Sequence, residues 1–158
     1  MKDYPDRFGF SISHTSRPKR VSEVDGVDYH FMTRDAMVKE IEQNMFLEHK
    51  IIHGNLYGTS YAGVREVINQ NKVCILDIDI QGVQDLMNRK VEATWIWLEP
   101  PSVEELSRRL HKRNSESEDI IQLRLKNSLQ EMALAHTLPF TFTIHYDSVP
   151  SAYSQLCT

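Results

Sequence analysis

The sequence predicts an α/β fold with a mostly parallel core sheet, and three observations lead to this prediction. Stretches rich in β-branched and aromatic residues alternate along the chain with stretches whose apolar residues recur at helical spacing. The run Val73–Leu76 is continuously apolar, which is typical of a strand buried on both faces of a parallel sheet. Two carboxylates, Asp77 and Asp79, follow at the carboxyl end of this run, where open α/β sheets bind their ligands. Taken alone, the two carboxylates could equally end a strand and cap the next helix.

Composition and charge limit the class of protein. A chain of 158 residues with 41% hydrophobic and 25% charged residues suits one folded, soluble domain. The net charge of −4 does not favour a general polyanion binder, so we expect no nucleic acid partner. Cys74 in the predicted strand and Cys157 near the end argue against a disulfide scaffold. With no apolar stretch of membrane-spanning length and no recognisable signal peptide, we expect a cytoplasmic protein without a membrane partner.

Residues 8–70 predict a small mixed sheet with two helices, placed ahead of the main sheet. Thr33 is suited to cap a helix on which Met37 and Ile41 recur at helical spacing. Thr59 is expected to cap a second helix, which carries Val67 before the core strand begins. Alternating or apolar patterns predict strands at 8–13, 29–32 and 46–52.

Residues 71–158 predict core strands and helices. A short helix should follow Gly82, and residues 94–98 form another candidate for a buried strand, which Pro100 and Pro101 end. Ser102 with Glu105, and Ser115 with Glu118, are spaced as capping boxes. We expect core strands over 71–100, a helical lid and core helix over 102–135, and a last strand and short tail over 140–158. The long helix should turn four apolar residues inward, namely Ile121, Leu125, Leu129 and Met132.

A polar, basic loop follows the first predicted strand and is the first candidate site. It contains Ser13, Arg17 and Arg20. Two guanidinium groups three residues apart can grip one phosphate, because each offers a planar fork of donors. So short a basic run, taken alone, is more often a solvated surface loop.

Glu48, Tyr57 and Thr59 form a second candidate group. Glu48 lies in a largely apolar, strand-like stretch, and a carboxylate buried there needs a donor partner. The N1–H and 2-amino groups of a guanine edge would be a suitable pair of donors. The alternative is a glutamate on an edge strand that faces water.

The third candidate group is an arginine cluster near the junction of two predicted helices: Arg108, Arg109, Arg113 and Arg124. Such a cluster could form a mobile lid that neutralises phosphate charge. A charge run on a helix is, however, more often a solvated face.

The motifs occur in an order and at a spacing that closely resemble the guanylate kinases. The chain reads F-G-F-S-I-S-H-T-S-R-P-K-R, then E-V-D-G-V-D-Y-H-F, F-L-E-H, G-N-L-Y-G-T-S and C-I-L-D-I-D-I-Q-G-V. It continues with P-P-S-V-E-E-L-S-R-R-L-H-K-R-N-S-E-S-E-D. The resemblance runs from about Phe8 to the 130s. It implies a guanylate-kinase-like parallel sheet of the P-loop NTPase class, with residues 8–70 as an inserted GMP-binding subdomain.

The resemblance also implies roles at matching positions. In the family, the γ-phosphoryl group of Mg-ATP is transferred to GMP, chemistry that depends on positioning and charge neutralisation. Glu48 and Thr59 would read the guanine base, and Asp77 would accept from its amino group or help order the Mg²⁺ site. Arg109, Arg113 and Arg124 resemble the arginines that close over the ATP phosphates, and with Arg17 they are the candidate catalytic residues. The GMP phosphate would be held by Ser13, Arg17, Arg20, Tyr29 and Tyr57.

The sequence departs from the family pattern at two places. No Gly-Lys pair occurs in the 158 residues, so the family's first strand, phosphate-binding loop and first helix are expected to be absent. We expect unpaired strand edges beside the strand at Val73 as a consequence. After Tyr146 and Asp147, where the family carries an Asn-Asp pair, the closing helix is expected to be shortened.

Three interpretations therefore remain open. The chain is an active guanylate kinase whose first segment is missing from the sequence given, a GMP-site or phosphopeptide-binding scaffold module with a protein partner, or a non-functional fragment. Since the acceptor-side residues are nearly complete, the sequence predicts GMP binding. It also predicts little or no binding of ATP and, as written, poor turnover.

Overall fold

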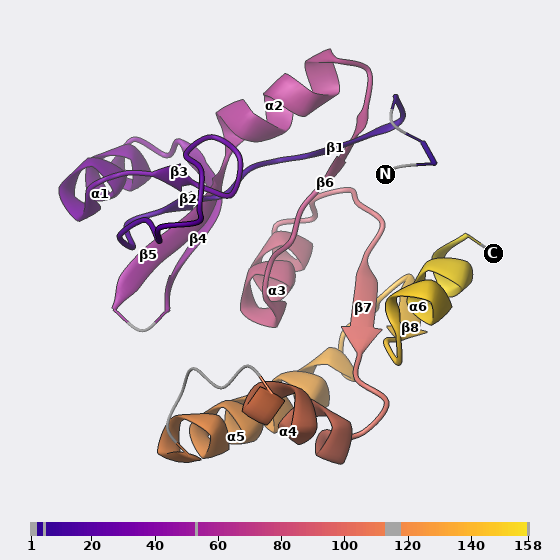
Figure 1. Cartoon of the computed structure of the whole chain (residues 1–158). Coiled ribbons are helices and arrows are strands. Elements are labelled where there is room, and N and C mark those ends of the chain that lie inside the picture. Colours follow the sequence, from indigo (N-terminus) through magenta and orange to yellow (C-terminus); the bar gives the residue numbers. More distant parts are fainter. Residues whose placement is uncertain (1–2, 5, 53, 113–117, 158) are drawn as a thin grey trace. The chain divides into compact units, whose positions relative to one another are not determined.

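A computed structural model describes residues 3–4, 6–52, 54–112 and 118–157 (Figure 1). Over these residues the chain divides into two compact units, Met1–Leu86 and Met87–Thr158. Each unit contains helices and parallel strand pairs, and the first unit adds a mixed sheet. The predicted α/β class is therefore confirmed.

A four-stranded mixed sheet is the largest element of the first unit. Its strands are arranged in the order β3-β2-β5-β4, with β2 and β3 parallel and the other neighbours antiparallel. α1 (Arg34–Glu42) packs against this sheet, and its Met37 joins Phe46 and Leu56 in a buried cluster. The strands are β2 (His14–Thr15), β3 (His30–Phe31), β4 (Phe46–Ile52) and β5 (Asn55–Ser60).

The caps of the first unit's helices follow the prediction at one helix and depart from it at the next. Thr33 caps α1, because its hydroxyl oxygen accepts from the amide of Ala36, as predicted. The cap of α2 (Tyr61–Asn69) is Ser60 and not Thr59, so that prediction is wrong. The Thr59 hydroxyl is turned to the buried Glu48 carboxylate instead.

A parallel strand pair forms the rest of the first unit. β1 (Phe8–Phe10) pairs with β6 (Val73–Ile75), α2 packs against β6, and α3 (Ile80–Asn88) begins before Gly82, not after it. Among the described residues, β6 has a strand neighbour on one edge only. Its predicted burial on both faces is wrong, since Val73 is 60% exposed. A three-residue strand with one strand neighbour has too little structure around it to bury both faces.

The second unit contains another parallel pair, β7 (Ile96–Glu99) with β8 (Phe142–His145). The prediction of a buried strand here is wrong, because Leu98 is 57% exposed. The helices are α4 (Val103–Lys112), α5 (Glu118–Ala135) and α6 (Val149–Leu156).

Helix caps and inward faces in the second unit follow the sequence only in part. Ser102 accepts the amide of Glu105 at 3.1 Å, as predicted, but the Glu105 carboxylate binds two arginines instead of reaching back to the cap. Along α5, Ile121 is buried, whereas Leu129 is 47% exposed and does not turn inward. The predicted cap at Ser115 lies outside the described residues. No helix of the described residues is long and apolar enough to cross a membrane.

Candidate functional site

A pocket of about 260 Å³ lies in the first unit, against the mixed sheet. The structure brings together five of the predicted site residues around it: Ser13, Tyr29, Glu48, Tyr57 and Asp77. A sixth residue of the lining, Lys50, was not predicted. The polar side chains come from β4, β5, the basic-loop region and the segment that follows β6, so one sheet and one strand end position the pocket.

Glu48 supplies a buried carboxylate to this pocket. On β4 it lies opposite Thr59 of β5, whose hydroxyl donates to Glu48 Oε1 at 2.7 Å. β4 is an edge strand of the mixed sheet, but Glu48 is only 6% exposed, so the alternative that it faces water is wrong. Its second oxygen, Oε2, is buried without a hydrogen-bond partner among the described residues. Because burying an unpartnered carboxylate oxygen is costly, the pocket is suited to a ligand that brings N–H donors.

Glycine keeps the space next to this oxygen open. A Cβ on Gly82 of α3 would lie 3.4 Å from Glu48 Oε2 and 3.3 Å from Asp79 Oδ1. The first turn of α3 therefore lies close to the open oxygen of Glu48. A Cβ at this position would press on Asp79 Oδ1 and would lie in van der Waals contact with Glu48 Oε2.

Two aromatic rings and an arginine also belong to the predicted site. The rings of Tyr29 and Tyr57 meet edge to face at 6.0 Å, and the Arg17 guanidinium lies 5.6 Å from the centre of the Tyr29 ring. The hydrogen bond of Arg17 to Glu23, and after it the interaction with Tyr57, raises the pKa of Arg17. The structure thus places Arg17 and the two tyrosines close together.

Glu23 organises the basic loop and was missed by the sequence analysis. Its carboxylate accepts from Arg17 at 2.7 and 3.1 Å and from the backbone amide of Arg20 at 2.7 Å. These bonds, that from Arg17 first, lower the pKa of Glu23. Glu23 therefore holds the loop in place, and it also competes with any phosphate for the Arg17 guanidinium. In the sequence, the signal that could have revealed this role is that Glu23 is an acidic residue close to the arginines of the basic loop.

The two carboxylates after β6 have different surroundings. Asp77 lines the pocket. Asp79 accepts the amide of Gly82 at 2.9 Å and pairs with Lys50 Nζ at 2.9 Å, so the helix-capping alternative holds for this residue. The described residues contain no group of three or more His, Cys, Asp and Glu side chains that could hold a metal ion.

The predicted lid arginines lie in the second unit. Arg109 on α4 donates to Glu105 Oε1 at 2.7 Å and to the backbone oxygens of Tyr146 and Asp147 at 3.0 and 2.6 Å. Its guanidinium also stacks on the Tyr146 ring at 4.9 Å. Arg124 lies half-buried on α5, and Arg113 falls outside the described residues.

Comparison with a solved structure identifies the fold. The crystal structure of guanylate kinase from Anaplasma phagocytophilum matches with a TM-score of 0.76 at 23% identity. The match covers 99% of this chain and 76% of that one. The fold is therefore that of the guanylate-kinase-like α/β proteins.

Sequence comparison then identifies the family. A profile of the guanylate kinase family matches residues 1–158. Guanylate kinase of Schizosaccharomyces pombe is 40% identical over 157 residues, 99% of this chain and 78% of that protein. Guanylate kinase 1 of Oryza sativa subsp. japonica is 48% identical over 132 residues, 84% of this chain. The match spans only 35% of the rice protein. The chain belongs to the guanylate kinase family.

Proposed function

We propose that the chain binds GMP in the pocket of its first unit. The observation that carries the proposal is the open oxygen of Glu48, buried and without a partner among the described residues. Guanine presents N1–H and a 2-amino group side by side, so it can donate to this carboxylate. Adenine presents an acceptor at N1 instead and would leave the oxygen unsatisfied.

The hydroxyl groups of the pocket lining and the nearby arginines suit the phosphate of the nucleotide. Ser13, Tyr29 and Tyr57 supply hydroxyl donors, and Arg17 lies against both tyrosines. Arg20 carries the second guanidinium of the loop. Phosphate binding would require Arg17 to exchange part of its contact with Glu23 for the ligand, an exchange between two charge-assisted interactions.

We further propose that these residues form the acceptor side of ATP-dependent GMP phosphorylation, the activity that the family implies. ATP would enter as the Mg²⁺ complex and supply the phosphoryl group. The residues present would bind and orient GMP, so that its phosphate oxygen faces the donor. Because no G-x-x-x-x-G-K-[ST] stretch occurs in the 158 residues, we expect the chain alone to bind ATP weakly and to turn it over slowly.

One observation favours a second candidate, a GMP-binding module without phosphoryl transfer. All three nitrogens of the Arg109 guanidinium donate to oxygens of its own unit. A lid arginine would have to give up these contacts before it could neutralise ATP phosphates.

Calorimetric titration of the purified chain tests both candidates. We expect GMP to bind, and a non-hydrolysable ATP analogue with Mg²⁺ to bind at least about a hundredfold more weakly than GMP. Glu48→Gln removes the charge that N1–H and the 2-amino group require and should abolish GMP binding. Glu66→Gln, an exposed change on α2, is the matched control and should bind like the parent.

The outcomes separate the interpretations. GMP binding that Glu48→Gln leaves intact would refute the proposed site. ATP binding comparable to that of GMP would show that other residues build a donor site, and steady turnover of GMP to GDP would exclude the binding module.

A further inference from the structure

Lys50 is the one cation among the described residues that line the pocket. The acidic members of the lining are Glu48 and Asp77. The side chain of Lys50 is 20% exposed, so most of it is removed from water. A lysine so placed requires anionic or acceptor partners, and it is not part of the site that the motif predicted.

The strand geometry puts Lys50 on the same face of β4 as Glu48. The two residues are two positions apart on β4. Glu48 lies opposite Thr59 of β5, and Lys50 lies opposite Tyr57. Residues at this spacing point to the same side of a sheet, with Cα atoms about 7 Å apart.

The ammonium group of Lys50 reaches the first turn of α3. Its Nζ lies 2.9 Å from Asp79 Oδ2, and Asp79 Oδ1 accepts the amide of Gly82 at 2.9 Å. Gly82 is also the residue whose missing Cβ leaves room beside Glu48 Oε2. A donor group on Lys50 and an acceptor oxygen on Glu48 are therefore both held next to the same helical turn.

We propose that Lys50 is a specificity residue of the pocket, whose ammonium donates to the 6-oxo oxygen of a purine base while Glu48 accepts from N1–H. This inference rests on the proposed binding of GMP. An ammonium has three N–H donors, and Asp79 uses one of them, so two are left for a ligand. The pair reads two adjacent atoms of the base, an acceptor at position 6 and a donor at position 1.

Adenine is rejected at both points by this pair. Its 6-amino group would face the donor on Lys50, and its N1 lone pair would face the carboxylate of Glu48. Asp79 acts as a positioning residue in this scheme, because its carboxylate fixes the ammonium and caps α3.

Binding of two nucleotides to two variants tests the assignment. 6-Thioguanosine 5′-monophosphate keeps N1–H and the 2-amino group of GMP but carries sulfur, a weak acceptor, at position 6. We expect the parent chain to prefer GMP over this analogue by on the order of tenfold or more, the effect of one charge-assisted hydrogen bond. Lys50→Met keeps the apolar stem without the donor and should reduce the preference to about twofold or less.

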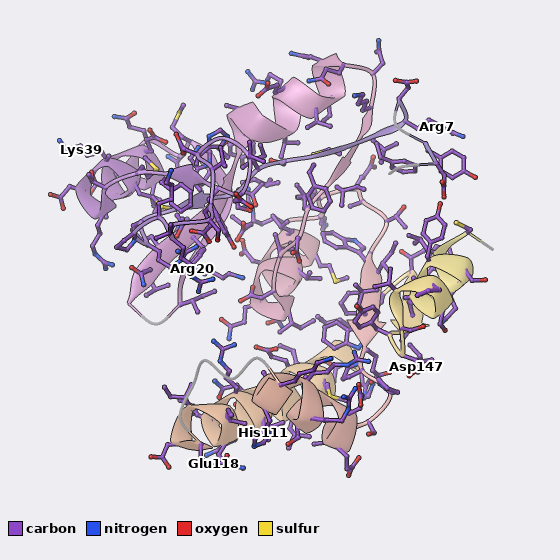
Figure 2. The ribbon with its side chains drawn as sticks, in the orientation of Figure 1. Arg7, Arg20, Lys39, His111, Glu118 and Asp147 are labelled. Carbon is purple, nitrogen blue, oxygen red and sulfur yellow. The ribbon has the colours of Figure 1, made fainter. Side chains whose placement is uncertain are left out.

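The control variant is Lys39→Met on α1. Lys39, labelled in Figure 2, is exposed on α1 and is not part of the pocket lining. It should keep the parental preference for GMP over the thio analogue. Lys50→Gln, which retains an N–H donor without the charge, provides a second variant if Lys50→Met does not fold. Its preference for GMP over the thio analogue should be smaller than that of the parent but still greater than one.

A third ligand, guanosine, distinguishes base from phosphate. If Lys50 reads the base, Lys50→Met leaves the ratio of GMP to guanosine affinity unchanged. If that ratio falls while the preference for GMP over the thio analogue stays at the parental value, the proposal is overturned and Lys50 contacts the phosphate. Failure of the parent chain to bind GMP at all would instead overturn the proposed function. If Lys50→Met binds GMP and keeps the parental preference for GMP over the thio analogue, only the proposed role of Lys50 is overturned.

Discussion

The mixed sheet of the first unit and the β7–β8 pair of the second bury their side chains very differently. In the mixed sheet, Met37, Phe46 and Leu56 form a closed apolar cluster, and polar Thr15 and Thr59 are buried beside it. On β7 and β8, Ile144 is buried, but Leu98 remains 57% exposed and Phe142 59% exposed.

The polar groups of the two regions also differ in how firmly they are held. Buried polar groups of the mixed sheet are tied to the backbone: Thr15 donates to the carbonyl of Leu56 at 3.1 Å, and the amide of Leu56 donates to Ser16 at 2.8 Å. Glu48 itself is held by the hydroxyl of Thr59, which donates to its Oε1 at 2.7 Å. In the second unit, the ion pairs of Glu105 with Arg108 and Arg109 are more open to water and contribute less to stability.

The largest expected effect is a cavity in the mixed sheet's core. Met37 is fully buried, so Met37→Ala should lower the free energy of unfolding by about 2 to 4 kcal/mol. Leu98→Ala on β7, the matched change at an exposed site, should cost about 0.5 kcal/mol or less. Amide hydrogen exchange measures the two losses of stability, on β4 and β5 for Met37→Ala and on β7 and β8 for Leu98→Ala. Equal losses would contradict the comparison.

The next effect concerns the hydrogen bond beneath the proposed base site. Thr59→Val keeps the shape of the side chain but removes the donor to Glu48 Oε1. A buried carboxylate would then lack this partner as well, at a cost of about 1 to 3 kcal/mol in unfolding free energy. Chemical denaturation measures the loss. Thr137→Val, which removes an exposed hydroxyl donor in the second unit, is the control and should change stability by less than about 0.5 kcal/mol.

Acid should weaken the mixed sheet through His14. Burial, followed by the charge of His30, lowers the pKa of His14 to about 4, while Asp25 opposes the shift. The His14 and His30 rings lie 4.7 Å apart on paired strands, and the Phe46 ring meets His14 edge to face. The unfolded chain therefore binds this proton more readily, and stability falls as the pH drops from about 6.5 toward 4.

The size of this effect is reduced by solvent, since His14 is only half-buried. We expect about 1 to 2 kcal/mol to be lost between pH 7 and pH 4. His14→Gln should flatten the pH dependence of the unfolding free energy over this range, whereas His49→Gln, at an exposed position of β4, should not. An unchanged slope in His14→Gln would exclude His14 as the source.

The sequence predicted local features of the fold better than features that depend on distant parts of the chain. Strand β4 and the cap at Thr33 follow from patterns within a few residues, and both agree with the structure. Burial of the run at Val73 depends on which elements cover it, which no local pattern contains. Its apolar, β-branched residues fit a buried strand equally well whether or not neighbours are present.

The site shows the same division. Glu48 was predicted because a carboxylate in an apolar stretch is anomalous by itself. Lys50 was not, since a lysine on a strand is usually exposed, and only its pairing with Asp79 reveals its position. Thr59 and Ser60 are adjacent hydroxyl residues, and strand alternation decides that Thr59 faces Glu48 and leaves Ser60 to cap α2.

The smallest expected effect lies in the second unit, at the exposed pair His111–Glu118. His111 Nε2 lies 3.0 Å from a Glu118 oxygen, and Figure 2 labels both residues. The backbone oxygen of Ser107, followed by Glu118, raises the pKa of His111. The pair is therefore complete at pH values below the ordinary pKa of histidine and is lost as the pH rises through the raised value.

NMR titration of the His111 ring measures this shift. Glu118→Gln should lower the pKa of His111 only part of the way to its ordinary value, because the larger contribution of Ser107 remains. Glu104→Gln, on the same helix as His111, is the control and should leave the pKa unchanged. Since both side chains are largely solvated, neither variant should measurably change the unfolding transition, in contrast to every change proposed for the mixed sheet. A loss of stability comparable to that of His14→Gln at low pH would mean that exposed pairs contribute to the second unit's fold, and the contrast between the two regions would fail.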